Sequence, residues 1–237
     1  MDPDAYFSTD SEGNIVSFKP SEYVVIEENG KYGYGHVEYL PPLPGKDEMS
    51  SWAYEDVTAA IEENFVPVYL QNLYHNNITR EEFCDTVVQA VAEILDTDVE
   101  TLVKQCTGKD LSAWEKEYPF RDTTNSNVIA AQALGIVFGR GDKTFDPYAT
   151  IARQEAAAFL TRGAKVLGMD TTITADAGFA DGEQVDTWAR DSVNFVNQIE
   201  VMNGTGNNMF TPQGKYSREQ SFATVYRLYR AMLAGQQ

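Results

Sequence analysis

The stretch FADGEQVDTWARDSVNFVNQIEVMNGTGNNMFTPQGKYSREQS, residues 179–221, contains the pattern that decides the fold. Apolar residues recur at helical spacing over 186–199, and a glycine-rich turn begins at Gly204. A short extended piece around Pro212 follows, and a second amphipathic segment begins after Ser217. The stretch therefore predicts a helix, a turn, an extended piece and a second helix, in that order.

The same pattern occurs earlier in the chain. GRGDKTFDPYATIARQEAAAF, residues 139–159, aligns with residues 204–224 at a constant spacing that pairs Arg153 with Arg218. NNITREEFCDTVVQAVAEIL, residues 76–95, is a third copy with Arg80 at the same position but without the glycine turn. The sequence thus predicts three tandem units at about 51–95, 118–168 and 177–234, with a connector at 96–117 that holds one short helix.

Each unit is expected to be a pair of helices. The first helices are predicted at roughly 52–65, 126–135 and 186–199, and the second helices begin after the hydroxyl residues Thr79, Thr150 and Ser217. One such pair cannot bury its apolar stripe alone, so three pairs should pack on one another. The expected fold is mainly α, with three lobes over residues 46–237.

Residues 1–45 differ from the rest of the chain. Apolar and polar residues alternate over 14–40, and Asn29-Gly30 is the dipeptide that favours a tight hairpin turn. A small β-hairpin is therefore predicted, followed by a proline-rich linker at 41–45.

The composition limits the classes of function. The chain has 237 residues, of which 43% are hydrophobic, and a formal net charge of −18. That charge disfavours nucleic-acid and membrane-surface binding, and no apolar run is long enough for a membrane span. The first residues do not resemble a signal peptide, so the protein is either cytosolic or the body of an exported protein whose leader has been removed.

Metal, cofactor and enzyme signatures are absent from the sequence. Cys84 and Cys106 are expected to be reduced, although a bridge between them stays open, and no cluster has the spacing of metal ligands. No nucleophile elbow, zinc helix or phosphate loop is present. We therefore expect no catalytic residue, no metal and no cofactor.

The repeated units resemble the S-layer homology (SLH) family. Its pattern is Phe-x-Asp, a tryptophan at the head of a helix, a glycine turn with Asp-Gly-Thr-Phe-x-Pro, and Thr-Arg-Ala-Glu at the start of a second helix. Residues 179–221 match almost all of it, FRDTTNSNVIAAQALGIVFGRGDKTFDPYATIARQEA (120–156) most of it, and SSWAYEDVTAAIEENFVP with NNITREEF an abbreviated form. The resemblance implies a pseudo-threefold bundle of three helical lobes.

The resemblance also implies a function. Family members attach exported proteins to secondary polysaccharides of the bacterial cell wall, often ones that carry a ketal-linked pyruvate, through grooves between the lobes. Localisation at the cell surface or cell wall of a Gram-positive type of bacterium, within a larger exported protein, would follow. Carried over by position, the ligand-binding residues are Arg80, Arg153, Arg218, Trp52, Trp188, Gly139, Gly141, Asp142, Gly204 and Gly206.

These residue types suit an acidic sugar. A guanidinium can hold a carboxylate with two parallel hydrogen bonds, a tryptophan face can carry a sugar ring, and the adjoining helix start is expected to offer free N–H donors. Because the third unit is the most complete, the groove between the second and third units should be the functional one, with Arg218 its main ligand. The first unit should contribute less.

Other interpretations of the same residues stay open. The arginines can be structural bridges between lobes, and the tryptophans can be partial core anchors. The whole chain can also be a surface interaction or scaffold module that has lost glycan binding, or a cell-wall glycan hydrolase with a carboxylate pair.

Overall fold

The computed structural model describes residues 49–117 and 120–235 and, ahead of them, the backbone of four short strands. The strands are β1 (Phe7–Thr9), β2 (Ile15–Phe18), β3 (Tyr23–Glu28) and β4 (Lys31–His36). β1 pairs antiparallel with β2, and β3 with β4, with Glu28 opposite Lys31. The predicted hairpin is confirmed, with a second one before it; Asn29, Gly30 and the linker at 41–45 lie outside the described residues.

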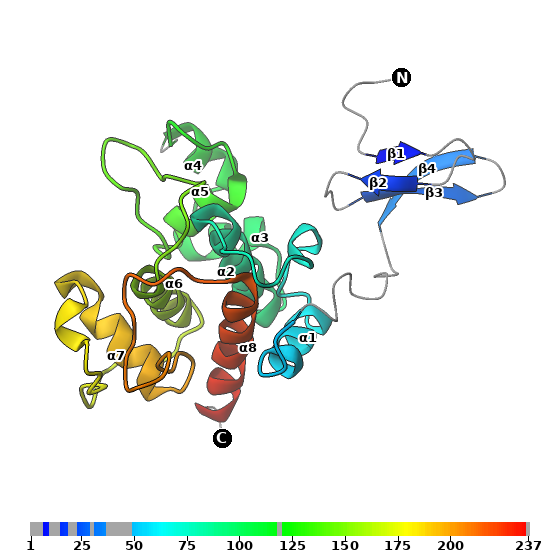
Figure 1. Cartoon of the computed structure of the whole chain (residues 1–237). Coiled ribbons are helices and arrows are strands. Elements are labelled where there is room, and N and C mark those ends of the chain that lie inside the picture. Colours follow the sequence, from blue (N-terminus) through cyan, green and yellow to red (C-terminus); the bar gives the residue numbers. More distant parts are fainter. Residues whose placement is uncertain are drawn as a thin grey trace.

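The rest of the described chain is helical, as predicted (Figure 1). The connector contains two helices, α3 and α4, where one was expected. The elements are α1 (Tyr54–Glu62), η2 (Val68–Leu70), α2 (Arg80–Ile94), α3 (Val99–Thr107), α4 (Leu111–Glu117), α5 (Ser126–Ala133), α6 (Arg153–Val166), η3 (Gly182–Gln184), η4 (Thr187–Ala189), α7 (Arg190–Gln198) and α8 (Arg218–Gly235).

Three lobes of paired helices form the body, but each lobe combines two repeats. The most extensive helix contacts are α2 with α5, α6 with α7, and α8 with α1. In each pair, the second helix of one repeat packs on the first helix of the next, and α1 closes the ring against α8. The long helices α2, α6 and α8 also contact one another at the centre, so no repeat can bury its apolar surface by itself.

The three segments before the long helices meet at the pseudo-threefold axis. Ile78, Ile151 and Tyr216 hold equivalent positions there, and none of their side chains is exposed. The Ile78 N–H donates to the Tyr216 carbonyl at 2.8 Å, and the Ile151 N–H donates to the Ile78 carbonyl at 3.1 Å. These cross-repeat bonds link all three repeats within one short layer.

The same layer completes the first turns of the long helices. The N–H groups of Arg80, Arg153 and Arg218 donate to the carbonyls of Ala149, Gly214 and Asn76 at 2.9, 3.0 and 2.9 Å. The following residue of each helix donates to a further carbonyl of the same neighbouring repeat. A helix start ordinarily leaves such N–H groups without an intrahelical partner. Here they are occupied, so the expectation of free N–H donors for a ligand is wrong.

The caps of these helices agree in part with the sequence. Thr79 accepts from the Glu82 N–H at 3.2 Å, and Ser217 accepts from the Gln220 N–H at 3.3 Å, as hydroxyl caps do. Thr150 is not a cap, because α6 begins three residues later, at Arg153, and its N-cap is Ala152. The Glu155 carboxylate nevertheless accepts from the Ala152 N–H at 3.0 Å, which supplies the other half of a capping box.

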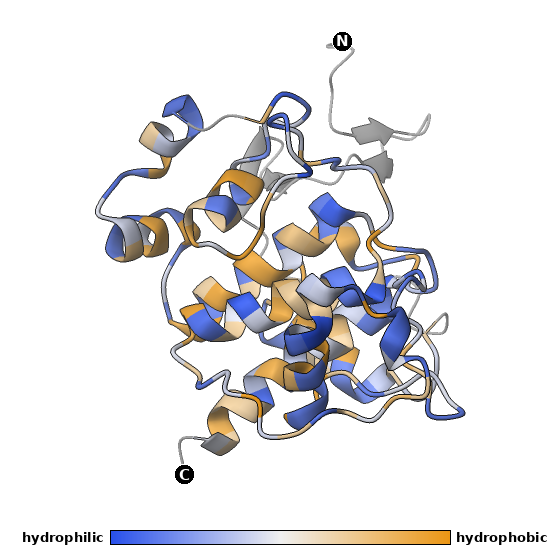
Figure 2. Cartoon of the chain, turned by 90° about the vertical axis from the view of Figure 1, so that its left-hand side faces the viewer, coloured by the Kyte–Doolittle hydropathy of each residue, from blue (hydrophilic) through white to orange (hydrophobic). Residues whose placement is uncertain are grey.

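Aromatic side chains from all three repeats fill the centre. Phe83 stacks on Phe159 with ring centroids 5.9 Å apart and meets Tyr216 edge-on at 5.8 Å. Figure 2 shows hydrophobic residues concentrated along the helices of this region. Cys84 is buried here and Cys106 lies exposed on α3, both as free thiols, as expected. Within the described residues, no helix combines the length and apolarity that crossing a membrane requires.

An aspartate fixes each glycine turn. Asp122 accepts from the N–H groups of Phe145 and Asp146, and Asp181 accepts from those of Phe210 and Thr211 at 2.8 and 2.7 Å. These are the aspartates of the two Phe-x-Asp motifs. Asp181 is only 3% exposed, so its carboxylate is the available acceptor for N–H groups that water cannot easily reach.

Replacing Asp181 with alanine is expected to destabilise the protein by about 2–4 kcal/mol, because two N–H groups lose a charged acceptor. The free energy of unfolding from urea titration measures the effect. Asp191→Ala, at an exposed position of α7, is the control and should cost less than about 1 kcal/mol. Equal losses in the two variants would contradict the assigned role of Asp181.

A buried carboxylate also joins the first repeat to the start of α5. Asp85 accepts a hydrogen bond from the Tyr69 hydroxyl and two from the Asn125 amide, at 3.0 and 3.1 Å. Burial raises the pKa of Asp85 from 3.8 to about 6. The folded state therefore holds a proton on this group over a pH range in which the unfolded chain has lost it.

The resulting pH dependence can be measured with Asp85→Asn, which cannot ionise. Because the folded pKa is the higher one, the contribution of Asp85 to stability is fully present below about pH 4 and is lost as the pH rises through about 6. Over that window, the parent should lose up to about 3 kcal/mol more unfolding free energy than the variant. Parallel stability curves in urea titrations across this range would refute the assignment.

Candidate functional site

The three repeated arginines reach into the turn of the neighbouring repeat. Arg80 donates from Nε to the Phe145 carbonyl at 3.0 Å, and Arg153 donates from Nε to the Phe210 carbonyl at 2.8 Å. Arg218 donates from Nη1 to the carbonyl of Asn72 at 3.1 Å. All three side chains therefore have a structural role between repeats, and they differ in what else they contact.

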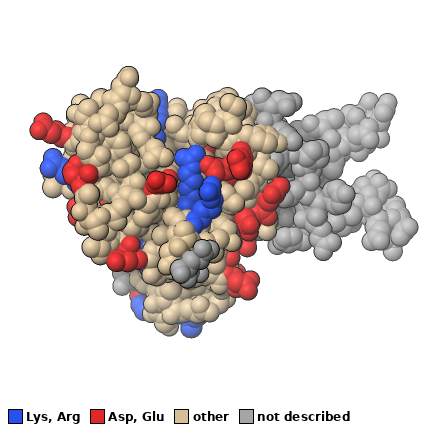
Figure 3. All heavy atoms as spheres, turned by 90° about the horizontal axis from the view of Figure 1, so that it is seen from below, with Lys and Arg blue, Asp and Glu red and all other residues tan. Residues whose placement is uncertain are grey.

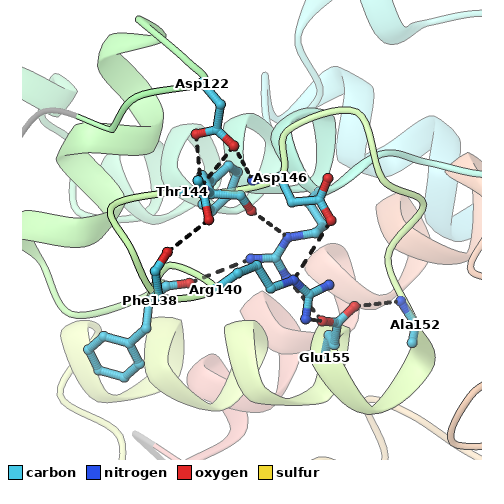
Figure 4. A network of polar contacts seen from close by, with 10 residues as sticks. Asp122, Phe138, Arg140, Thr144, Asp146, Ala152 and Glu155 are labelled. Atoms are coloured by element: carbon cyan, nitrogen blue, oxygen red, sulfur yellow. Dashed lines mark hydrogen bonds and ion pairs between the residues drawn. The ribbon is translucent and has the colours of Figure 1, made fainter.

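Arg80 is fully engaged. Its side chain is 3% exposed, and Nη1 forms an ion pair of 3.1 Å with Glu155, which also binds Arg140. Its Nη2 donates to the Phe138 carbonyl at 3.5 Å. Figure 4 shows this network, in which Arg140 lies between Glu155 and Asp146. The two cations and two carboxylates neutralise one another, so this contact has no unpaired charge for a ligand.

Arg218 is also paired, but at the contact between the third and first repeats. Its Nη2 binds the Glu82 carboxylate at 2.6 Å, and its Nη1 also donates to the Asn72 side chain at 2.9 Å. Its Nε is buried and has no hydrogen-bond partner among the described residues. The sequence placed Arg218 in the groove between the second and third repeats, whereas its contacts are with the first.

Arg153 forms no ion pair with a carboxylate in the described part of the chain. Its Nη2 donates to the Asn203 carbonyl at 2.8 Å, and its guanidinium lies 4.9 Å from the centre of the Phe210 ring. Burial lowers the pKa of Arg153, and the Asp181 charge opposes that shift; an arginine stays protonated in either case. This guanidinium is therefore a buried positive charge with an incomplete set of partners.

A groove of about 340 Å³ opens at Arg153. It combines residues of all three repeats: the third supplies its turn and one face of α8, the second supplies Arg153, and the first supplies Trp52. Among the residues that the structure describes, two arginines and no carboxylate line it. The lining residues, called here the Arg153 groove, are Trp52, Arg153, Met202, Asn203, Gly204, Thr205, Tyr216, Gln220, Thr224 and Arg227.

Both candidate tryptophans are half exposed rather than core anchors. Trp52 is 50% exposed and Trp188 is 53% exposed. The Trp52 ring lies on the wall of the Arg153 groove with the Arg227 guanidinium 6.0 Å from its centre. Trp188, on η4, does not line this groove. Arg227 in turn binds Asp56 of α1 at 2.6 Å, which holds it beside the groove.

The candidate glycines are required by the turns. A Cβ on Gly139 would lie 2.5 Å from the Thr144 carbonyl oxygen, and one on Gly204 would lie 2.8 Å from that of Met209. Gly141 and Gly206 have φ angles of +98° and +113°, where residues with a side chain are strained. Of the four glycines, Gly204 lines the Arg153 groove.

Asp142 is a surface residue of the same turn. Its side chain is 87% exposed and forms an ion pair of 2.8 Å with Arg121. The structure thus brings together three of the residues that the sequence selected, Arg153, Gly204 and Trp52. It leaves Arg80, Arg218, Trp188, Gly139, Gly141, Asp142 and Gly206 outside the Arg153 groove.

Sequence reasoning missed the groove residues that belong to no motif. Arg227 lies on α8 beyond the matching segments, and Asn203 contributes through its carbonyl, which no side-chain pattern reveals. Gln220 was detectable, because it stands where the other two units have Glu82 and Glu155.

The architecture defines a three-lobed helical repeat protein with a groove where its repeats meet. A model of the S-layer homology domain matches residues 119–157 and 178–220. The chain therefore carries two S-layer homology repeats over these residues, as the motifs indicated. Repeats of this kind support a cell-surface anchoring module.

Relatives include three named polysaccharide-degrading enzymes. An endoglucanase of Bacillus sp. (strain KSM-635) is 30% identical over 125 residues, which are 51% of this chain and 13% of that protein. An amylopullulanase of Thermoanaerobacterium thermosulfurigenes is 26% identical over 187 residues, 77% of this chain and 9% of that protein. An exoglucanase of Acetivibrio thermocellus is 28% identical over 116 residues, which are 46% of this chain and 10% of that protein. The chain thus spans about a tenth of the length of these relatives.

Gly204→Ala is expected to cost roughly 1–3 kcal/mol of stability, because the new methyl group collides with backbone. Gly182→Ala is the matched control, since a Cβ there meets nothing within 4 Å. Thermal melting should show a clear decrease for the first variant and little change for the second. An unchanged melting temperature in Gly204→Ala would mean that the turn accommodates the methyl group without loss of stability, and would contradict the prediction.

Proposed function

We propose that this module holds an exported protein at the cell wall by binding a carboxylate-bearing secondary polysaccharide in the Arg153 groove. The observation that carries the proposal is the charge of the lining, which among the described residues has no acid and two arginines, Arg153 and the Asp56-paired Arg227, in a chain of net charge −18. At physiological salt, the Debye length is about 8 Å, so remote acids affect such a site little. Figure 3 shows the face where α8 ends: a small cluster of basic groups lies near its centre, bordered by acidic side chains, and a few further basic groups lie at the edges.

The remaining groove residues suit a sugar. Trp52 offers a flat apolar face of ring size, and Asn203, Thr205 and Gln220 add polar groups at the rim. A pyruvyl ketal is a small carboxylate on a sugar ring, which a guanidinium can bind while the ring lies against the indole. We therefore assign the carboxylate to Arg153 and Arg227 and the sugar ring to Trp52.

Two features favour binding over hydrolysis in this groove. Glycoside hydrolysis ordinarily needs a pair of carboxyl groups at the scissile bond, and no Asp or Glu within 49–117 and 120–235 lines the groove. The enzymes to which the chain is similar are about ten times longer than the matched region. By analogy, we propose that the chain serves as the anchor of a larger exported protein and has no catalytic activity of its own.

Binding to the wall is tested by sedimentation with purified sacculi of a Gram-positive bacterium, before and after acid extraction of the secondary polymer. The parent protein should pellet with intact sacculi and stay in solution with extracted ones. Absence of pelleting with both would favour a surface interaction module, and release of reducing sugar would favour an enzyme.

The site assignment is tested by Arg153→Lys, which keeps the charge and removes the planar fork. We expect wall binding to weaken about tenfold to hundredfold, the effect of losing one hydrogen bond to a charged group. Arg218→Lys is the matched control, because it disturbs an equivalent contact between repeats outside the groove. Thermal melting of both variants separates binding from stability. Equal loss of wall binding in the two variants would refute the assignment to the Arg153 groove.

A further inference from the structure

The side chain of the third residue of each long helix, α2, α6 and α8, caps the start of that helix. Glu82, Glu155 and Gln220 are equivalent, and one side-chain oxygen of each accepts the N–H of the N-cap residue. The distances to the N–H groups of Thr79, Ala152 and Ser217 are 2.9, 3.0 and 3.0 Å. At each position, the capping bond uses one of the two polar atoms at the end of the side chain. The other polar atom can contact a different group.

In two of the three repeats, that further atom is an oxygen that binds an arginine. Glu155 Oε1 binds Nη1 of Arg80, and Glu82 Oε1 binds Nη2 of Arg218. Both carboxylates are largely buried, with 8% and 21% of the side chain exposed. Each acts as an internal anion that occupies the guanidinium of the preceding repeat.

Gln220 cannot do this. Its oxygen accepts the Ser217 N–H, so the atom that remains is the amide nitrogen, which only donates. Nη1 of Arg153 is the atom equivalent to the one that Arg80 directs at Glu155. Within 49–117 and 120–235, it makes no hydrogen bond of its own. The two donor groups thus belong to residues that line one groove, and among the described residues that line it there is no carboxylate.

The second acid of the Arg80 network is replaced as well. Asp146, which lies 4.0 Å from Arg140, corresponds to Thr211 in the third repeat, and Arg140 corresponds to Thr205. The third repeat therefore lacks counterparts of both carboxylates that neutralise Arg80 and Arg140, while the arginine that it contacts, Arg153 of the second repeat, stays buried. A carboxylate from outside would take the place that Glu155 has beside Arg80.

We propose that Gln220 is the specificity-determining residue that leaves the Arg153 groove open to an anionic sugar. Glu155 and Glu82 close the corresponding contacts at Arg80 and Arg218. The inference takes its ligand from the proposed function, but the exchange of amide for carboxylate can be tested with a simple anion. The proposal implies that the module has one open anion site, at Arg153. The equivalent positions at Arg80 and Arg218 are closed by Glu155 and Glu82.

The first experiment uses acetate as the probe and follows the 15N signals of the arginine side chains. In the parent, acetate should shift the signal of Arg153 and leave those of Arg80 and Arg218 unchanged. In Gln220→Glu, the Arg153 signal should no longer respond, because a linked carboxylate competes at an effective concentration on the order of millimolar or more. In Glu155→Gln, the Arg80 signal should begin to respond.

The second experiment measures sedimentation with sacculi. Gln220→Glu should weaken pelleting at least about tenfold, whereas Gln184→Glu should not, since it adds the same charge at an exposed position outside the groove. Thermal melting should show that Gln220→Glu is folded, because the new carboxylate reproduces a pair that the other two repeats already contain. Equal effects of the two variants would indicate general charge repulsion and overturn the proposal.

The two proposals can fail separately. If the parent does not pellet but acetate shifts only Arg153, and Gln220→Glu abolishes the shift, the wall-binding function is refuted and the role of Gln220 stands. If the parent pellets and Gln220→Glu pellets equally well, with an unchanged acetate response at Arg153, the role of Gln220 is refuted and wall binding stands.

Discussion

The hydrogen bonds that complete the first turn of each long helix come from a different repeat, and the rest of the structure depends on them. A helix cannot begin in a buried position with its first N–H groups unpaired. Here the carbonyls of the neighbouring turn satisfy them, which fixes where each turn lies against each helix. The arginine that follows the cap reaches into the same turn. Folding of one repeat therefore requires the next one to be in place.

This arrangement gives the arginines two tasks that compete. As bridges, they bind carbonyls and carboxylates of the neighbouring repeat. As ligands for an acidic sugar, they need a donor that the protein leaves free. Arg80 and Arg218 are committed to Glu155 and Glu82, whereas Arg153 keeps its bridging bonds through Nε and Nη2 and retains Nη1. The structural and the binding interpretations of these residues thus apply to different atoms of one side chain.

The sequence predicted the helical fold, the three lobes and the hairpin because these depend on local signals. The switch in hydrophobic period, the Asn-Gly pair and the repeated Gly, Pro and Arg positions were sufficient. The pairing of α1 with α8 was not predictable in this way, since it joins the two ends of the helical region and no local pattern encodes it.

The site was predicted only in its parts. Arg153 and Arg218 hold the same position in their repeats. They differ in the repeat that each contacts, which is the third for Arg153 and the first for Arg218. Likewise, the free N–H groups expected at the helix starts are occupied by carbonyls that come from distant segments. The motifs are most complete in the third repeat, which led to the choice of Arg218 as the main ligand. Ion pairs between repeats determine instead which arginine keeps an N–H donor without a protein partner.

The closure of the ring by α1 and α8 also has a mechanical consequence. Trp52 and Arg227, on the two walls of the Arg153 groove, belong to the segments that lead into α1 and run along α8. A polymer held in the groove and a tether that pulls on the chain ahead of α1 would therefore load the same lobe. Tension would pass through a short path between α1, α8 and the groove, and the lobes formed by α2 with α5 and α6 with α7 would carry little of it.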